Sequence, residues 1–325
     1  MANIMIPPGW RMPEREATPE AIYLDRRTLL KLMGLGGVAL AGLAGCENIH
    51  DDRPFIEKLK TYTFSEADRK AYPARRNPAF GLDRTMTEEH VAAQFNNFYE
   101  FSDDKDDVWA KVETFQPRPW EVEVTGLVTR PFRMDVDQLL LKMPMEERLY
   151  RHRCVEAWAM AVPWTGFPMK ALMDYVEPKP SARYVAMTSF LRPLEAPGHR
   201  NDNMPWPYTE ALTMAEAMNP LTLLATGIYG HPLPKQHGAP IRLVTPWKYG
   251  YKSVKSIVRI EFTAGQPFTF WNTLLPEEYD YPANVNPDVP HPRWSQRTER
   301  MIGTRERRDT VLYNGYGEYV ASLYA

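Results

Sequence analysis

Proline is the residue that most restricts how this chain can fold. Thirty prolines are distributed along 325 residues, about twice the usual share of roughly 5%. Each proline fixes φ and removes a backbone donor, so long helices and long central strands are interrupted. With 17 tyrosines and 9 tryptophans accompanying the prolines, the sequence favours short strands and long ordered loops over a helical bundle.

Runs of branched and aromatic residues predict strands, and two other segments predict helices. The predicted strands cover residues 120–128, 148–154, 183–190, 221–229, 241–245 and 256–263, and the predicted helices cover residues 135–141 and 169–176. Residues 47–110 are expected to wrap around the body, and residues 266–300 to form a long packed loop region. Because strands and helices do not alternate regularly, the predicted fold class is α+β.

The charge balance excludes one broad class of function. The chain has 39 basic and 41 acidic side chains, a formal net charge of -2, whereas a nucleic-acid binder normally has a basic excess. We therefore expect no nucleic-acid partner. Hydrophobic residues at 44% and charged residues at 25% are also typical of a soluble globular chain rather than a disordered or polytopic membrane protein.

The first 45 residues have the pattern of an export signal. Arg26 and Arg27 precede an uncharged run over residues 32–45, which is too short to cross a bilayer as a helix of about 20 residues. The paired arginines favour the twin-arginine route, which carries folded proteins to the periplasm and so suggests a cofactor. The alternative is an ordinary secretory signal. We predict a signal peptide at 1–45 and a single catalytic domain at 46–325.

A second processing signal overlaps the end of this leader. The segment Leu43-Ala44-Gly45-Cys46 matches the box that precedes the lipid-modified cysteine of bacterial lipoproteins. Processing there would tether the protein to a membrane through Cys46. Cleavage near residues 39–41 would instead leave Cys46 as a free thiol.

Cys154 is the one cysteine in the predicted body of the protein beyond Cys46. A lone thiol in an oxidising compartment is either buried and inert or held by chemistry. Its neighbours Arg151, His152, Arg153 and Glu156 favour the second reading, because nearby cations are expected to lower the thiol pKa and favour a thiolate that binds soft metals.

Several common catalytic patterns are absent from the sequence. Neither HExxH, CxxC nor GxSxG occurs, which argues against zinc and against a serine hydrolase. His231 and His237 lie six residues apart across two prolines and are interpreted as loop residues rather than a ligand pair.

Five motifs together resemble one known family. The chain is similar to the sulfite oxidase superfamily, and within it to the catalytic subunits of periplasmic protein-methionine-sulfoxide reductases (MsrP, also called YedY). The motifs lie at residues 96–101, 151–168, 238–243, 246–252 and 283–295. They occur in the family's order, and the resemblance extends over nearly the whole chain.

The resemblance implies a molybdopterin cofactor whose single molybdenum is bonded to the sulfur of Cys154. It also implies a set of residues that hold the cofactor. Ser189 stands where the family often has threonine, and His237 where it often has asparagine. The implied cofactor-binding residues are Asn96, Tyr99, Glu100, Cys154, Ser189, His237, Arg242, Ser253, Val254 and Lys255. Taken singly, each has an ordinary structural reading: Lys248, Lys252 and Lys255, for example, could form a solvated face.

The implied activity is removal of oxygen from methionine sulfoxide in oxidised exported proteins. Glu156 is a further catalytic candidate, because it is expected near the metal and could influence proton movement. The family further implies a membrane haem b subunit that passes electrons from the quinone pool.

Two alternatives remain open at this point. Sulfite oxidation on the same scaffold usually comes with an additional immunoglobulin-like domain, for which the 62 residues after Thr263 leave little room. A non-catalytic exported binding lipoprotein, with Cys154 as inert core, would contain no molybdenum.

Overall fold

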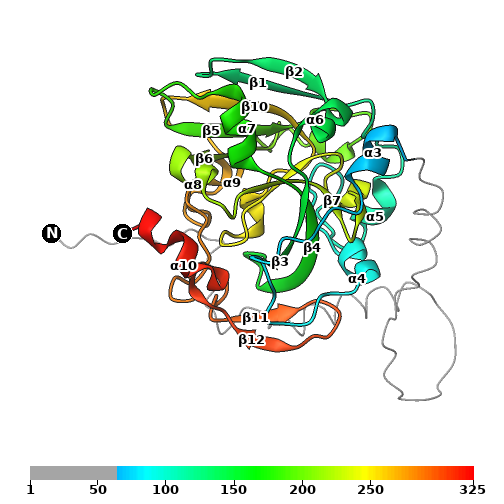
Figure 1. Ribbon diagram of the computed structural model, residues 1–325. Helices are drawn as coiled ribbons and strands as arrows, with labels where there is room; N and C mark the ends of the chain where they lie inside the picture. The colour runs from blue at the N-terminus through cyan, green and yellow to red at the C-terminus, as the bar shows by residue number, and fades with distance from the viewer. Residues whose placement is uncertain (1–63) are drawn as a thin grey trace, which may run out of the picture. The chain divides into compact units, whose positions relative to one another are not determined.

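Two mixed β-sheets form the framework of residues 64–325, the part of the chain that the computed structural model describes (Figure 1). The first sheet has the strand order β2-β1-β10-β5-β6. Strands β1 and β10 run parallel, whereas the other neighbours are antiparallel. Its strands are β1 (Glu121–Gly126), β2 (Phe132–Asp135), β5 (Tyr184–Ser189), β6 (Thr209–Thr213) and β10 (Ile257–Thr263).

The second sheet has seven strands with β4 at its centre. Its main path is β12-β11-β4-β7-β8, with β3 paired to β4 and β9 paired to β7. Figure 1 shows the first sheet at the top and the β11–β12 hairpin at the bottom. The strands are β3 (Glu146–Arg153), β4 (Trp158–Pro168), β7 (Leu223–Ile228), β8 (His231–Pro232), β9 (Arg242–Val244), β11 (Thr298–Met301) and β12 (Arg307–Asp309).

The described α-helices are short, from four to eight residues, as the proline content predicts. Asp135 caps α6 by accepting a hydrogen bond from the Asp137 amide at 2.8 Å. The α-helices are α3 (Glu66–Ala71), α4 (Glu89–Gln94), α5 (Val108–Lys111), α6 (Val136–Lys142), α7 (Met169–Val176), α8 (Met214–Met218), α9 (Phe270–Leu274) and α10 (Gly317–Val320).

The predicted α+β class is confirmed, and every predicted strand and helix has a counterpart. The six strands correspond to β1, β3, β5, β7, β9 and β10, and the two helices to α6 and α7. The prediction of residues 266–300 as loop alone was wrong, because α9 and the start of β11 lie within it. Three short helices, α3 to α5, lie in the described part of residues 47–110.

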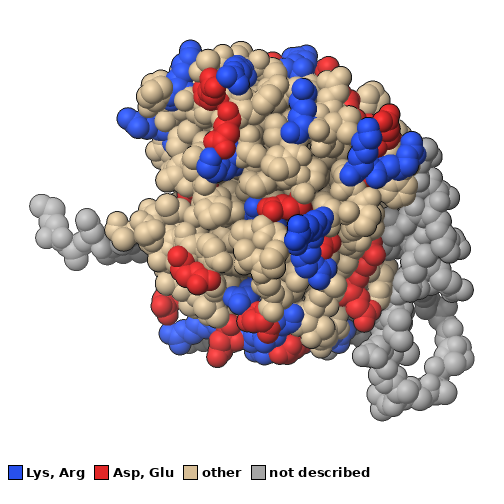
Figure 2. Space-filling model, in the orientation of Figure 1, with Lys and Arg blue, Asp and Glu red and all other residues tan. Residues whose placement is uncertain are grey.

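One large apolar core joins the two sheets. Trp120, Trp164 and Trp247 are all completely or almost completely buried in it, and ten of the eleven residues of β4 are buried. Acidic and basic side chains are interspersed over the face shown in Figure 2, in keeping with the near-neutral net charge of the chain.

Some predictions concern residues that the structure does not describe. The signal peptide at 1–45 and the lipidation site at Cys46 lie outside residues 64–325. Within the described residues, no helix is both long enough and apolar enough to cross a membrane. The assignment of 46–325 as one catalytic domain stays a prediction.

Lys248 and Lys252 do not form a solvated face, because only 2% and 1% of their surfaces are exposed. The Lys248 ammonium lies 2.5 Å from the Glu216 carboxylate and also donates to the Asn284 side chain at 2.9 Å. The Tyr324 hydroxyl lies 2.6 Å from Glu216 and 3.0 Å from the Lys248 ammonium. This network ties the β9–β10 connection to α8 and to the segment after α10.

We expect Tyr324→Phe to lower the free energy of unfolding by about 1–2 kcal/mol, because buried groups of Lys248, Glu216 and Trp247 lose a hydrogen-bond partner. Urea denaturation of both proteins measures this difference. Tyr175→Phe is the control, since that ring is 36% exposed. Equal stabilities of wild type and Tyr324→Phe would contradict the assignment.

Candidate active site

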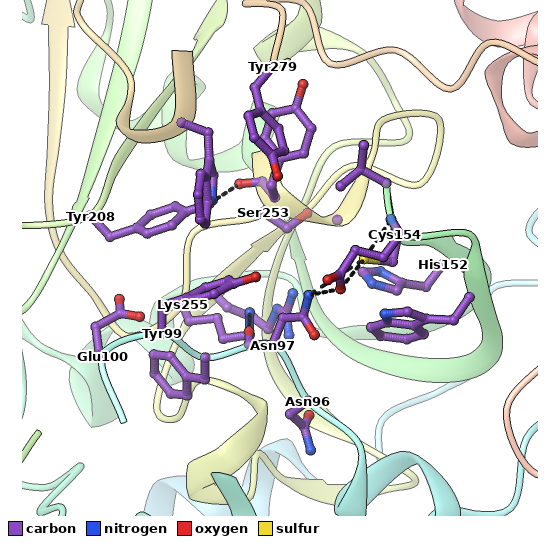
Figure 3. Close-up of a pocket in the computed structure, with 18 of the residues that line it drawn as sticks. Asn96, Asn97, Tyr99, Glu100, His152, Cys154, Tyr208, Ser253, Lys255 and Tyr279 are labelled. Atoms are coloured by element: carbon purple, nitrogen blue, oxygen red, sulfur yellow. Dashed lines mark hydrogen bonds between the residues drawn. The ribbon is translucent and has the colours of Figure 1, made fainter. Parts of the chain in front are cut away.

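A pocket of about 740 Å³, counted to its open mouth, lies among the motif segments (Figure 3). Its walls come from the segment after α4, the β3–β4 turn, β9, the β9–β10 connection and the α9 region. The lining includes Asn96, Asn97, Tyr99, Glu100, His152, Cys154, Val155, Glu156, Met160, Tyr208, Arg242, Tyr251, Ser253, Lys255, Trp271 and Tyr279.

The turn between β3 and β4 presents Cys154 to this pocket. The Cys154 amide donates to the Trp158 carbonyl at 2.9 Å, and the Ala157 amide donates to the Cys154 carbonyl at 3.1 Å. Ala157 has φ +64°, a left-handed conformation that costs a residue with a β-carbon about 1–2 kcal/mol. A strained, doubly hydrogen-bonded turn therefore fixes the position of a thiol that is only 4% exposed.

Three polar side chains surround the Cys154 sulfur. The Asn97 amide lies 2.7 Å from Glu156 Oε2 and 3.6 Å from the sulfur. Glu156 Oε2 is itself 3.6 Å from the sulfur, and Lys105 Nζ is 3.1 Å from Glu156 Oε1. The side chains of Lys105 and Glu156 are each 26% exposed, so this group connects the buried sulfur with solvent.

The prediction that nearby cations lower the pKa of the Cys154 thiol was wrong for the protein without a bound metal. Burial, followed by the Glu156 carboxylate, raises the pKa of the thiol above its ordinary value, and Arg153 offsets only part of this. The Arg151 guanidinium is directed to Asp83 and to the Asn314 carbonyl. A thiol in this position ionises when a metal coordinates it, because a coordinating thiol is deprotonated outright.

On one side of the pocket, basic groups outnumber acidic ones. Arg242 is 3% exposed, and burial lowers its pKa to about 9. Burial and the charge of Arg242 also lower the pKa of Lys255 and of His152, the latter to about 3. Glu100 is the nearby carboxyl, and burial raises its pKa. This arrangement favours an anionic ligand.

Arg242 in particular has donors without an anionic partner. Its guanidinium donates to the His237 carbonyl at 2.9 Å and to the Leu243 carbonyl at 3.3 Å. Among residues 64–325 it forms no ion pair with a carboxylate. Such a group is suited to a phosphate, which a guanidinium can bind through two parallel hydrogen bonds.

Most of the predicted cofactor-binding residues line this pocket, but three do not. Asn96, Tyr99, Glu100, Arg242, Ser253 and Lys255 line it together with Cys154. Asn96 is directed away from Cys154 in Figure 3, and its amide donates to the Ala93 carbonyl at 2.8 Å. Val254 is completely buried beside the pocket-lining Ser253. Ser189 and His237 are also outside the pocket lining.

Ser189 and His237 nevertheless have unused polar atoms. Both are 1% exposed, and within the described residues neither the Ser189 hydroxyl nor either ring nitrogen of His237 has a hydrogen-bond partner with good geometry. The hydroxyl is still close enough to Glu100 to lower the pKa of that carboxyl slightly against the effect of burial. Buried polar groups without partners are uncommon and indicate an additional ligand.

Aromatic side chains form the remaining wall. The rings of Tyr99 and Trp271 are in edge-to-face contact with their centroids 4.9 Å apart, and the ring centroids of Trp271 and Tyr279 are also 4.9 Å apart. Tyr251 contacts Tyr279 at 5.3 Å, and Tyr208 also lines the pocket. An aromatic surface of this kind binds apolar or sulfur-bearing groups well.

Sequence reasoning did not assign a role to Asn97, to Lys105 or to Trp271 and Tyr279 of the aromatic wall. Asn97 stands within a recognised motif, next to Asn96, so its position was available. Lys105 lies in a charged segment without a pattern, and Trp271 lies in the region predicted as loop. The interpretation of His231 as a loop residue was wrong, because it lies in the short strand β8, where it pairs with Glu89 at 2.5 Å.

The buried His237 predicts a specific loss of stability in acid. Burial, with Arg242 beside it, lowers its pKa well below the ordinary 6.5. The unfolded chain therefore takes up a proton at a higher pH than the folded one. The stability that neutral His237 contributes is complete above about pH 6.5 and is lost as pH falls, by up to about 1.4 kcal/mol per unit.

We therefore expect the free energy of unfolding of cofactor-free His237→Asn to fall less steeply below pH 6.5 than that of the wild-type protein. Denaturant unfolding of both proteins at pH 7, 5.5 and 4.5 measures the difference between their slopes. Parallel profiles would show that His237 takes up protons equally in both states.

Comparison with known proteins places the pocket in a family context. Residues 109–271 match the family model described as oxidoreductase molybdopterin binding domain. The protein-methionine-sulfoxide reductase catalytic subunit MsrP of Burkholderia mallei is 45% identical over 97% of this chain and 94% of its own length. The protein of the same name from Gluconobacter oxydans is 46% identical over 95% of this chain and 93% of its own length.

A solved structure with partial similarity is the sulfane dehydrogenase SoxCD from Paracoccus pantotrophus. It has 16% sequence identity and a TM-score of 0.45, and the match covers 84% of this chain and 63% of that chain.

Proposed function

The chain belongs to the family of protein-methionine-sulfoxide reductase catalytic subunits, MsrP, and we propose that it removes the oxygen atom from methionine sulfoxide in proteins. The observation that carries the proposal is the buried Cys154 thiol in a pocket that also holds the buried Arg242 guanidinium and the Lys255 ammonium. The family's molybdopterin-binding domain covers this part of the chain. A bound molybdenum centre supplies the two-electron chemistry that takes oxygen from a sulfoxide.

The residues of the pocket fit a molybdopterin. Cys154 offers a soft sulfur ligand to molybdenum. Arg242 and Lys255, with the backbone around Ser253 and Val254, suit the dianionic phosphate of the pterin. Ser189 and His237 also have unused polar atoms, but they lie outside the pocket lining and so do not support a direct contact with the cofactor.

The side chains near the sulfur would prepare the substrate for reaction. The aromatic wall of Tyr99, Trp271 and Tyr279 suits the methyl and methylene groups on either side of the sulfoxide sulfur. The Glu156 carboxylate, held by the Asn97 amide and the Lys105 ammonium, can take a proton from solvent and present it next to the Cys154 sulfur. Removal of a sulfoxide oxygen as water consumes two protons, so a proton-bearing group at this position is useful.

The supply of electrons and the location of the protein belong to the same proposal. The relatives are named catalytic subunits, which supports a partner subunit, and we assign to it haem b and a link to the quinone pool. The leader at residues 1–45 supports export to the periplasm by the twin-arginine route, with Cys46 as a site for lipid attachment. Oxidised exported proteins are the proposed substrates.

The decisive experiment uses protein purified from the cell envelope. Elemental analysis is expected to give one molybdenum per chain, and a chemically reduced viologen dye is expected to drive reduction of methionine sulfoxide in an oxidised protein. Molybdenum-loaded protein that is inert on sulfoxides but oxidises sulfite would replace the proposal by sulfite oxidation. Protein without molybdenum would favour the non-catalytic reading.

We expect Glu156→Gln to lower kcat by about a hundredfold, because proton supply beside the reacting atoms is lost, while molybdenum content is retained. Steady-state assays with elemental analysis check this. Glu261→Gln on β10, outside the pocket lining, serves as the control. An unchanged kcat would remove Glu156 from the catalytic group.

A further inference from the structure

Three charged side chains lie buried next to the Cys154 turn and outside the pocket lining. The side chains of Arg153, Glu299 and Arg84 are 0%, 2% and 5% exposed. Arg84 Nη1 lies 2.6 Å from Glu299 Oε1, and Arg153 Nε lies 3.3 Å from Glu299 Oε2. None of the three lines the pocket, so none can touch the substrate.

This triad is in direct contact with the turn that carries the thiol. Arg153 Nη1 donates to the carbonyl of Cys154, and Arg153 Nη2 donates to the Gln296 side chain at 2.9 Å and to the Thr310 hydroxyl at 3.2 Å. The Gln296 amide donates in turn to the Val155 carbonyl at 2.7 Å. The backbone of residues 154–155 is thus held from behind by residues far apart in the sequence.

Within the triad, two guanidinium groups face a single buried carboxylate. The other acidic partner of Arg84, Asp83, lies 3.0 Å away and is half exposed, so the buried part of the pairing depends on Glu299. Burying ions costs several kcal/mol each unless their partners are well placed. Nonpolar residues of similar size would commonly be at least as stable, so stability alone does not account for this arrangement.

The Arg153 guanidinium, which contacts the Cys154 carbonyl, has the sign of charge that suits what the pocket is proposed to hold. Cys154 bonded to a metal is a thiolate, and a nearby positive charge stabilises the more negative, reduced states of a centre relative to the oxidised state. Glu299 pairs with both arginines. Substituting Arg84 or Glu299 therefore changes the electrostatic field at the Cys154 sulfur without altering the pocket lining.

We propose that Arg84 and Glu299 are positioning residues that set the electrostatic field around the Arg153 guanidinium next to Cys154, and thereby tune the reduction potential of the molybdenum centre. The inference rests on the proposed cofactor, but not on the identity of the substrate. It gives these two residues opposite effects: Glu299 lowers the potential and Arg84 raises it.

The test measures the molybdenum potential in purified holoenzyme by redox titration followed by electron paramagnetic resonance. Arg84→Gln removes a positive charge and is expected to lower the potential. Glu299→Gln removes a negative charge and is expected to raise it. The double variant Arg84→Gln/Glu299→Gln removes one charge of each sign and is expected to return close to wild type.

Two further variants separate charge from structure. Arg84→Lys keeps the charge while changing the geometry, so its potential is expected to stay near wild type. Asp68→Asn is the matched control, because Asp68 is a buried carboxylate paired with Arg118 at 2.8 Å, and neither residue lines the pocket. If Glu299→Gln does not fold, the comparison of Arg84→Gln with Arg84→Lys decides the question alone.

Equal potentials in Arg84→Gln and wild type would overturn the proposal, as would shifts of the same sign in Arg84→Gln and Glu299→Gln. An Arg84→Lys variant that shifts as far as Arg84→Gln would also overturn it, since geometry rather than charge would then be responsible. If wild-type protein itself carries no molybdenum, the proposed function fails instead, and elemental analysis of the same samples identifies that case.

Discussion

Cys154→Ser is expected to lower sulfoxide reduction by roughly a thousandfold or more, equivalent to about 4 kcal/mol of lost transition-state stabilisation. A serine hydroxyl does not ionise readily and is a poor ligand for a soft metal compared with a thiolate. The protein should remain folded, because the substitution exchanges one small side chain for another in a turn fixed by backbone hydrogen bonds. Steady-state assays with a reduced dye measure the loss.

The same variant also tests the metal–sulfur bond directly. X-ray absorption at the molybdenum edge should show one fewer sulfur ligand than in wild type, while some metal stays bound because the phosphate-facing residues are intact. Met160→Leu is the matched control, since Met160 is another sulfur-bearing residue of the pocket, 3% exposed, and it should change neither the spectrum nor the activity greatly. An unchanged ligand count in Cys154→Ser would refute ligation by this sulfur.

Arg242→Gln is expected to have opposite effects on cofactor binding and on the stability of the empty protein. Within residues 64–325 the buried guanidinium contacts two carbonyls and the Trp164 ring but pairs with no carboxylate. Burial lowers its pKa to about 9, so its charge is costly until an anion binds. Without that charge, cofactor content should fall at least about tenfold. The cofactor-free protein should unfold within about 1 kcal/mol of wild type, or be more stable.

Cofactor analysis after acid release and thermal unfolding of the empty proteins measure the two effects. Arg148→Gln is the matched control: Arg148 is also 3% exposed, but it pairs with Glu146 and donates to the Pro220 carbonyl. That variant should lose stability and keep the cofactor. If Arg242→Gln retains the cofactor, or its empty form loses more than about 3 kcal/mol, Arg242 is a structural residue rather than an anion-binding one.

Local sequence patterns were sufficient for the elements and for much of the pocket. Branched runs gave the positions of β1, β5 and β10, and the motifs at residues 96–101 and 238–243 supplied Glu100 and Arg242, which line the pocket. Such motifs are informative because several of their residues are neighbours both in sequence and around the pocket.

Features that depend on distant pairing could not be obtained in this way. Strand β4 contains Pro163, which argues against a central strand. In the structure Pro163 is opposite Leu149 of β3, and β7 pairs with β4 only from Trp164 onward, so the missing donor is tolerated. Arg84 and Glu299, which are in contact, are 215 residues apart in the sequence. The pKa of the Cys154 thiol depends on burial, which the adjacent residues in the sequence do not reveal.

The assembly of the pocket limits where this protein can be cut or grafted. The segment matched by the family model, residues 109–271, contains Cys154 and Arg242, yet it would make a poor excised module. Removing the flanks would delete Asn97 and Lys105 from one side and Tyr279 from the other, and would also take away β11, leaving an open edge on β4. Engineered fusions or circular permutants should therefore keep residues 64–325 together and place new junctions in exposed turns.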